Sequence, residues 1–210
     1  VSVIDLVTNT IIDTIDVGTS PMGVGVRPDG KKIYVTNRTS NEVSVIDVET
    51  NTVDATIDVG NYPVGTAFNA DGSLLYVTNF FSNNISVINT TTNTVINTID
   101  AGVNPWGIAL SPDDSNIYVA NQADNNVSVI NASTGIATDM ISVQTGPYDV
   151  AISADGTKVY VSNRRGTTLN TQGAISIIDI GSTSVEETLF TQSTYINAYD
   201  FAIQPTGDFY

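Results

Sequence analysis

Four tetrapeptides decide the fold of this chain: Tyr34-Val-Thr-Asn37, Tyr76-Val-Thr-Asn79, Tyr118-Val-Ala-Asn121 and Tyr160-Val-Ser-Asn163. Each begins 42 residues after the one before. A period of about 40 to 45 residues, with four short β-type segments in each unit, is typical of a propeller blade rather than of a helical solenoid. The stride therefore predicts an all-β fold, a β-propeller built from four-stranded blades.

The unit at residues 18–59 illustrates the order of strands and turns in one blade. Its predicted strands, from the innermost outward, are 24–26, 32–36, 43–47 and 53–59. Arg27-Pro-Asp-Gly30 separates the first two strands and has the residue types of a tight turn. Apolar residues occur on both faces of the middle strands, as expected for a blade that packs between two neighbours.

A second hairpin in each unit carries Asn at a fixed place, and one copy carries Gly instead. The residues are Asn9, Asn51, Asn93 and Gly135. Asn and Gly share little except their tolerance of positive φ. The exchange therefore predicts a left-handed turn position, and no functional role is needed to explain these Asn residues.

The repeats amount to about five blades, and the whole of residues 1–210 is expected to form a single propeller domain. Residues 1–5 match a third strand, and Tyr210 stands where a second strand should begin. We expect the N-terminal residues 1–17 and the C-terminal residues 198–210 to share the closing blade. That blade lacks a second strand, which would leave an unpaired sheet edge. Either the chain is an excerpt of a longer array, or another chain supplies the strand.

Charge and residue usage exclude several classes of function. The chain has 22 acidic and 7 basic residues, a net charge of −15, which disfavours binding to nucleic acid and anionic lipid. It contains neither Cys nor His, so disulfides, thiolate chemistry and His-ligated haem or copper are excluded, and we expect no cofactor. No apolar run approaches the roughly 20 residues of a membrane span.

The motifs Tyr34-Val-Thr-Asn37, Val43-Ser-Val-Ile-Asp47 and Thr50-Asn-Thr52 recur along essentially the whole chain, which thereby resembles the YVTN-repeat β-propeller family. The resemblance implies an extracellular or cell-surface protein, of the kind found in surface layers, with a structural or recognition role and no catalysis. Its implied partners are a protein or glycan at the cell surface, or other copies of the same chain. Similar propellers also occur in lactone hydrolases, so a lactonase-like metal-dependent enzyme is one alternative and a carbohydrate-binding propeller is another.

The loops that enter the innermost strands carry large side chains at what we interpret as equivalent positions. These are Met22, Tyr62, Trp106, Tyr148 and Tyr199, and Phe80-Phe81 and Arg164-Arg165 join the same face. Aromatic rings around a channel mouth can stack on sugar rings or anchor a peptide. Tyr62, Trp106, Tyr148 and Tyr199 are therefore the candidate ligand-binding residues. The alternative is that each ring packs over its own blade as a lid.

Two carboxylates are the candidate metal ligands. Asp149 and Asp200 stand at the start of innermost strands, where other units have Gly23, Gly65 and Gly107. Ca²⁺ takes oxygen ligands only, so this pair could hold it; alternatively the two side chains cap loop amides or face water. Five Asn-x-Ser/Thr triplets are candidate glycosylation sites, at Asn37, Asn84, Asn89, Asn126 and Asn131.

Overall fold

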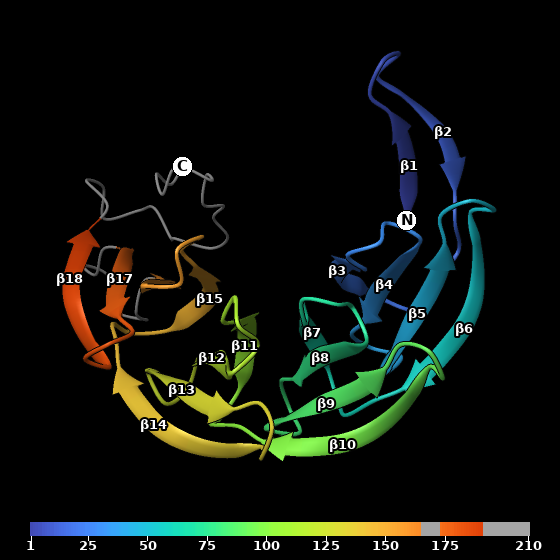
Figure 1. Ribbon diagram of the computed structural model, residues 1–210. Helices are drawn as coiled ribbons and strands as arrows, with labels where there is room; N and C mark the ends of the chain where they lie inside the picture. Colours follow the sequence, from blue (N-terminus) through green and yellow to red (C-terminus); the bar gives the residue numbers. More distant parts are fainter. Residues whose placement is uncertain (165–172, 191–210) are drawn as a thin grey trace.

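The protein is seen in a computed structural model that describes residues 1–164 and 173–190. Four antiparallel sheets of four strands each follow one another along an arc, and a two-stranded hairpin stands at one end of it (Figure 1). This is the predicted propeller, with four full blades and part of a fifth. The described residues contain no helix that is long and apolar enough to cross a lipid bilayer.

The strands of each blade are consecutive in the chain and neighbours in the sheet. The hairpin consists of β1 (Ser2–Asp5) and β2 (Thr10–Thr14). The first full blade consists of β3 (Pro21–Val26), β4 (Lys32–Asn37), β5 (Glu42–Asp47) and β6 (Thr52–Asp58). The second consists of β7 (Pro63–Phe68), β8 (Leu74–Asn79), β9 (Asn84–Asn89) and β10 (Thr94–Asp100). The third consists of β11 (Pro105–Leu110), β12 (Asn116–Asn121), β13 (Asn126–Asn131) and β14 (Ile136–Ser142). The fourth consists of β15 (Pro147–Ile152), β16 (Lys158–Asn163), β17 (Ala174–Asp179) and β18 (Ser184–Phe190).

The observed strands differ from the predicted ones mainly at their ends. The innermost strand β3 begins at Pro21, three residues before the predicted start, and an irregularity in its register with β4 lies between Pro21 and Val24. The predicted left-handed turn position is confirmed, because φ is positive at each of its four members. These are Asn9 (53°), Asn51 (54°), Asn93 (53°) and Gly135 (69°).

The core of the molecule lies between the blades. Tyr34 and Val45 of the first blade pack against Leu75 and Val77 of the second, and all four side chains are fully buried. On the opposite face of the first blade, Ile46 packs against the hairpin. Both faces of a blade are therefore apolar for the predicted reason, since each meets a neighbour instead of water.

The polar residues of the repeated tetrapeptide hold the fold together. The Thr36 hydroxyl accepts a hydrogen bond from the Gly23 N–H of its own blade (2.8 Å) and donates one to the Val64 carbonyl of the next (3.0 Å). The final Asn of each tetrapeptide donates from Nδ2 to a Ser on the adjacent strand. The pairs are Asn37–Ser44 (2.8 Å), Asn79–Ser86 (2.9 Å), Asn121–Ser128 (2.7 Å) and Asn163–Ser176 (3.0 Å).

The hairpin is one part of the expected closing blade. Ile4, on the face turned away from the first blade, is 55% exposed, whereas its equivalent Ile46 is fully buried. Residues 198–210, which were expected to share this blade, lie outside the described residues. That the two ends of the chain meet in one blade therefore stays a prediction.

Candidate functional site

Aromatic side chains from three blades form a continuous row, which we call the aromatic ladder. It consists of Tyr62, Phe81, Phe80, Trp106 and Tyr148, in that order. The ring centroids are 4.6 Å apart for Tyr62 and Phe81, 5.0 Å for Phe81 and Phe80, 5.3 Å for Phe80 and Trp106, and 4.4 Å for Trp106 and Tyr148. These separations are typical of favourable ring pairs. The candidate residues of three blades are thus brought together into one surface, because the rings contact one another across blade boundaries.

Two arginines lie at the ends of the ladder. The Arg38 guanidinium, after strand β4, lies 4.7 Å from the centre of the Tyr62 ring. The Arg164 guanidinium, after strand β16, lies 5.4 Å from the centre of the Tyr148 ring. Both distances are within the range of a cation–π interaction. Of the other predicted members of this face, Arg165 and Tyr199 lie outside the described residues.

Tyr62 occupies a different position in its repeat from the one predicted. The residue equivalent to Trp106 and Tyr148 is Val64, which is 1% exposed, and Tyr62 lies two residues earlier, before β7 begins. Its φ is +62°, a left-handed value that is uncommon for a bulky residue. The equivalent position in the next blade is Asn104, also with positive φ. The predicted equivalence of Tyr62 to the other candidates was therefore wrong, although its ring does join them.

The ladder is partly open to solvent. Phe81 is 62% exposed, while Tyr148 is 8% exposed because Trp106 and Arg164 pack against it. Sequence reasoning placed Phe80-Phe81 on this face but did not foresee that Phe80 would bridge Tyr62 and Trp106. Phe81 therefore gives the ladder one solvent-exposed apolar member.

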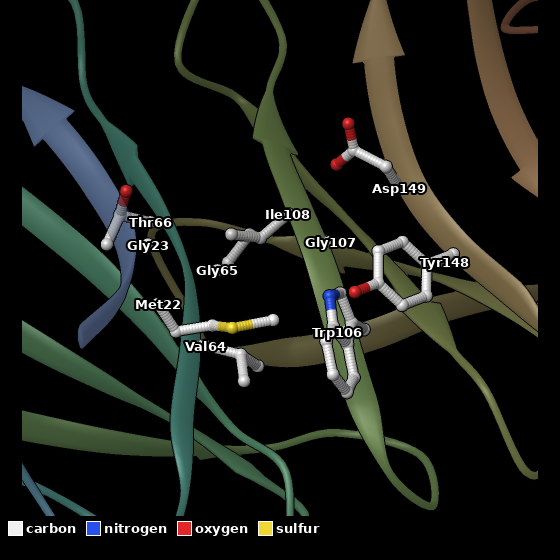
Figure 2. Close-up of a pocket in the computed structure, with 10 residues that line it drawn as sticks. All are labelled: Met22, Gly23, Val64, Gly65, Thr66, Trp106, Gly107, Ile108, Tyr148 and Asp149. Carbon is white, nitrogen blue, oxygen red and sulfur yellow. The ribbon is translucent and has the colours of Figure 1, made fainter. Parts of the chain in front are cut away.

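A small pocket of about 150 Å³ opens beside the ladder, among the innermost strands β3, β7, β11 and β15. In Figure 2 the Met22 side chain reaches toward Trp106 across the pocket, with Val64 below it. The Asp149 carboxylate stands on the far side, above Tyr148. The remaining lining comes from Gly23, Gly65, Thr66, Gly107 and Ile108. The pocket thus has one indole wall, a thioether opposite it and one acid.

Asp149 stands where three other blades have Gly, as predicted, and its backbone N–H donates a 2.9 Å hydrogen bond to the Ser162 hydroxyl. A Cβ added to Gly107 would lie 2.7 Å from a carboxylate oxygen of Asp149, so strands β11 and β15 approach closely here. Asp200, the other predicted metal ligand, lies outside the described residues. Within residues 1–164 and 173–190, no three His, Cys, Asp or Glu residues gather closely enough to hold a metal ion.

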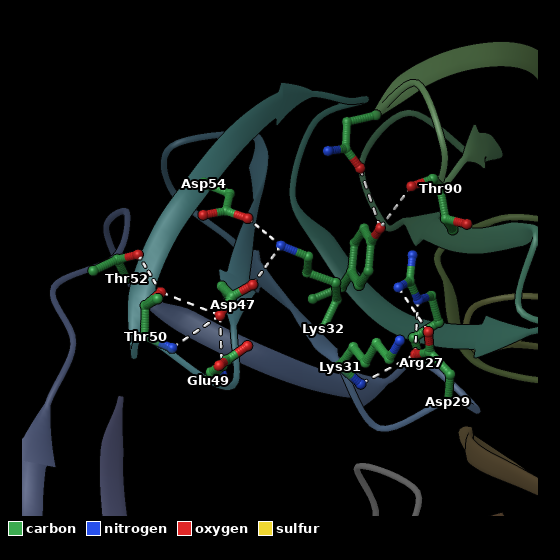
Figure 3. Close-up of polar contacts among 12 residues, drawn as sticks. Arg27, Asp29, Lys31, Lys32, Asp47, Glu49, Thr50, Thr52, Asp54 and Thr90 are labelled. Atoms are coloured by element: carbon green, nitrogen blue, oxygen red, sulfur yellow. Dashed lines mark hydrogen bonds and ion pairs between the residues drawn. The ribbon is translucent and has the colours of Figure 1, made fainter.

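The Asp residues of the tight turns have structural partners. Asp113 accepts hydrogen bonds from the hydroxyls of Ser111 and Ser115, which lower the pKa of Asp113 to about 2. In the first blade, Lys32 pairs with Asp47 and Asp54, and Arg27 pairs with Asp29 (Figure 3). The hydrogen bond from Lys32 is the largest cause of a lowered pKa at Asp47.

Basic residues are absent from the middle of the chain. No Lys or Arg occurs between Arg38 and Lys158. The second and third blades, which carry Phe80, Phe81 and Trp106, therefore contain acidic residues and no basic ones. These two blades carry Asp71, Asp100, Asp113, Asp114, Asp124 and Asp139, a net charge of −6.

The five candidate glycosylation sites differ in exposure. Asn37 is fully buried and its amide bonds to Ser44, so the folded chain does not present it to solvent. The other four are partly exposed: Asn84, Asn89, Asn126 and Asn131. Asn89 and Asn131 use their side-chain oxygens to accept backbone N–H groups within turns. Modification of these four stays a prediction.

Comparison with known proteins supports a propeller family. Residues 6–100 match the family model described as "Lactonase, 7-bladed beta-propeller". Among solved structures, the chain is similar to Kuenenia stuttgartiensis hydrazine synthase, with a TM-score of 0.82 and 27% sequence identity. That similarity covers 94% of this chain and 57% of the hydrazine synthase chain, so this chain spans little more than half of its length. No curated protein matches the sequence.

Proposed function

We propose that this chain is a non-catalytic recognition module of a cell surface or extracellular layer, and that it binds its partner through the aromatic ladder. The observation that carries the proposal is the continuous contact of five rings from three blades, one of which, Phe81, is exposed to solvent. Large rings lose little conformational entropy on binding and supply much of the energy of protein and sugar recognition.

The backbone at Tyr62 supports the same assignment. The same turn position is left-handed in all four blades, with φ of 59° at Ser20, 56° at Asn104 and 67° at Gly146, and at Tyr62 it holds a bulky residue in a conformation that costs about 1–3 kcal/mol. The equivalent Asn104 tolerates this conformation more easily. Placing Tyr62 against Phe81 and Arg38 is thus a feature that stability alone does not favour.

The location at a surface rests on composition and on the repeated motif. The resemblance to YVTN-repeat propellers favours a surface layer, and the partners proposed on that basis are a protein, a glycan or further copies of the chain. An antibody against residues 18–59 should label intact cells of the source organism as strongly as permeabilised cells. Labelling that requires permeabilisation would contradict this location.

The binding role is tested with glycan and peptide arrays probed by four proteins: the unmodified chain, Phe81→Ser, Trp106→Ala and the control Ile96→Ser. Ile96 is 55% exposed on the outer strand β10, so its replacement removes a comparable apolar group far from the ladder. We expect the array signal to be lost in both ladder variants and kept in the control. Equal signals from all four proteins would refute the role of the ladder, and glycan binding that survives Trp106→Ala would exclude carbohydrate recognition there.

A second candidate, a lactonase-like hydrolase, is favoured by the family model that matches residues 6–100. Asp149 is the one carboxylate of the described residues that lines the pocket beside the ladder, whereas Ca²⁺ takes six to eight oxygen ligands. The described residues alone therefore do not complete a calcium site. Hydrolysis of γ- or δ-lactones that requires Ca²⁺ and disappears in Asp149→Ala would replace the recognition proposal with this one.

A further inference from the structure

We infer that the pocket beside Trp106 takes a lysine or arginine side chain from a basic segment of a protein partner. The inference rests on the proposed recognition role and names the class of partner. Its first support is size. Pockets for small-molecule ligands usually enclose about 300–1,000 Å³. A pocket of about 150 Å³ is too small for such a ligand and suits one long amino-acid side chain.

The second support is the chemistry of the walls. Met22 and Val64 offer apolar surface for the methylene stem of a long side chain, and Met22 is 41% exposed and adaptable. Trp106 lines the same pocket, and an indole face is the strongest aromatic partner for a cation. An amphipathic side chain with an apolar stem and a charged head therefore matches this lining.

The third support is that two arginines of the chain itself already pack against rings of the ladder. Arg38 and Arg164 lie over the rings of Tyr62 and Tyr148, at distances of 4.7 and 5.4 Å. These two intramolecular contacts occupy the ends of the ladder. Trp106, at the pocket between them, has rings as its aromatic neighbours, namely Phe80 and Tyr148. An incoming Lys or Arg at Trp106 would add a third contact of the same kind.

The fourth support is charge complementarity. Asp149 lines the pocket, and a carboxylate has about four acceptor positions, so it can accept an ammonium or guanidinium group in addition to its other interactions. Of the four blades that line the pocket, the second and third, which supply Val64 and Trp106, contain acidic residues and no basic one, so they attract cations. The negative electrostatic potential of these acidic residues raises the rate of encounter with a basic segment, and added salt weakens this effect.

Trp106 is the one tryptophan of the chain, so its fluorescence reports directly on the pocket. The probe is the acetylated and amidated peptide Gly-Leu-Lys-Phe-Lys-Leu-Gly, compared with a version in which norleucine replaces both lysines. Norleucine keeps the methylene stem and removes the charge. We expect the lysine peptide to bind at least about tenfold more tightly, as a desolvated cation–π contact combined with a charge pair implies.

A matched pair of variants assigns the effect to the pocket. Asp149→Asn and Asp100→Asn each remove one negative charge, but Asp100 is exposed on the outer strand β10. We expect Asp149→Asn to abolish the preference for lysine over norleucine and Asp100→Asn to retain it. Equal loss in both variants would overturn the inference, because it would reduce the preference to overall charge.

The peptide titration separates this inference from the proposed function. If the lysine and norleucine peptides bind equally and both lose affinity in Phe81→Ser, the ladder is a recognition surface and the cation pocket is refuted. If neither peptide changes Trp106 fluorescence, the cation pocket is also refuted, and the arrays decide the recognition role independently.

Discussion

The hydroxyl of Thr78 donates a 2.6 Å hydrogen bond to the carbonyl oxygen of Trp106, across the boundary between the second and third blades. The same hydroxyl accepts a 2.9 Å hydrogen bond from the N–H of Gly65 in its own blade. One side chain of the repeated tetrapeptide thus joins two innermost strands and fixes the backbone that carries Trp106. Thr36 makes the same connection one blade earlier, whereas Ala120 has no hydroxyl to make it one blade later.

Thr78→Val should destabilise the protein by about 1–3 kcal/mol, because it leaves the partly buried N–H of Gly65 and the carbonyl of Trp106 without this partner while keeping the side-chain shape. Ala120→Ser should add the missing hydroxyl and stabilise by about 0.5–1.5 kcal/mol. Urea unfolding followed by Trp106 fluorescence measures both changes. Identical unfolding midpoints for Thr78→Val and the unmodified chain would show that the connection contributes nothing.

The sequence predicts most of this fold because the deciding signals are local and repeated. Turn positions follow from residue types that tolerate positive φ, as at Asn51 and Gly135. Strand positions follow from the 42-residue stride of the tetrapeptides. The connection made by Thr78 was missed, although a signal for it exists. Thr36, Thr78, Ala120 and Ser162 occupy one position, and three of the four carry a hydroxyl.

The aromatic ladder could be predicted only in part. The sequence places Trp106 and Tyr148 at one register position, but contact between blades depends on how loops fold. The Phe80 ring contacts Trp106 of the third blade, and the Phe80 carbonyl accepts a 3.1 Å hydrogen bond from the Asn104 amide; no spacing rule gives these contacts. Tyr62 was assigned by residue type rather than by stride, which is why its register was wrong.

Because the backbone of Tyr62 is strained, we expect Tyr62→Asn to change the stability of the protein little. Relief of a left-handed conformation worth about 1–3 kcal/mol should offset the lost contacts with Phe81 and Arg38, so the net change in unfolding free energy should stay within about 1 kcal/mol. Tyr148→Asn is the comparison: Tyr148 is 8% exposed and has no positive φ, and its loss should cost about 3–5 kcal/mol. Equal losses in the two variants would contradict the strain at Tyr62.

Stability should fall in acid partly through Asp113. Hydrogen bonds from Ser111 and Ser115 depress its pKa in the folded state to about 2, below the unfolded value near 3.9. A depressed pKa adds stability that is complete above the unfolded value and is lost as the pH falls from about 4 toward 2. Asp113→Asn should therefore lower the melting temperature at pH 6, and the difference from the unmodified chain should shrink toward pH 2.

The control for this pH dependence is Asp100→Asn, which removes the same charge from an exposed position on the outer strand β10. Its melting temperature should track that of the unmodified chain across the same pH range. Parallel curves for Asp113→Asn and the unmodified chain, separated by a constant amount from pH 6 to pH 2, would show that the turn carboxylate does not contribute through its ionisation.

Gly65→Ala tests how closely the innermost strands approach at the pocket. A Cβ on Gly65 would lie 2.3 Å from the carbonyl oxygen of Trp106 and 3.0 Å from the Thr78 hydroxyl, so strand β11 would have to move. We expect a loss of more than about 2 kcal/mol in urea unfolding and a shift in Trp106 emission, because the obstacle is backbone rather than a flexible side chain. Gly181→Ala is the matched control, since its nearest contact is 3.4 Å from the Asp179 carboxylate, and it should change stability by less than about 0.5 kcal/mol. Equal unfolding midpoints for the two variants would mean that β7 and β11 separate at little cost, in which case the pocket has no fixed shape with which to select a side chain.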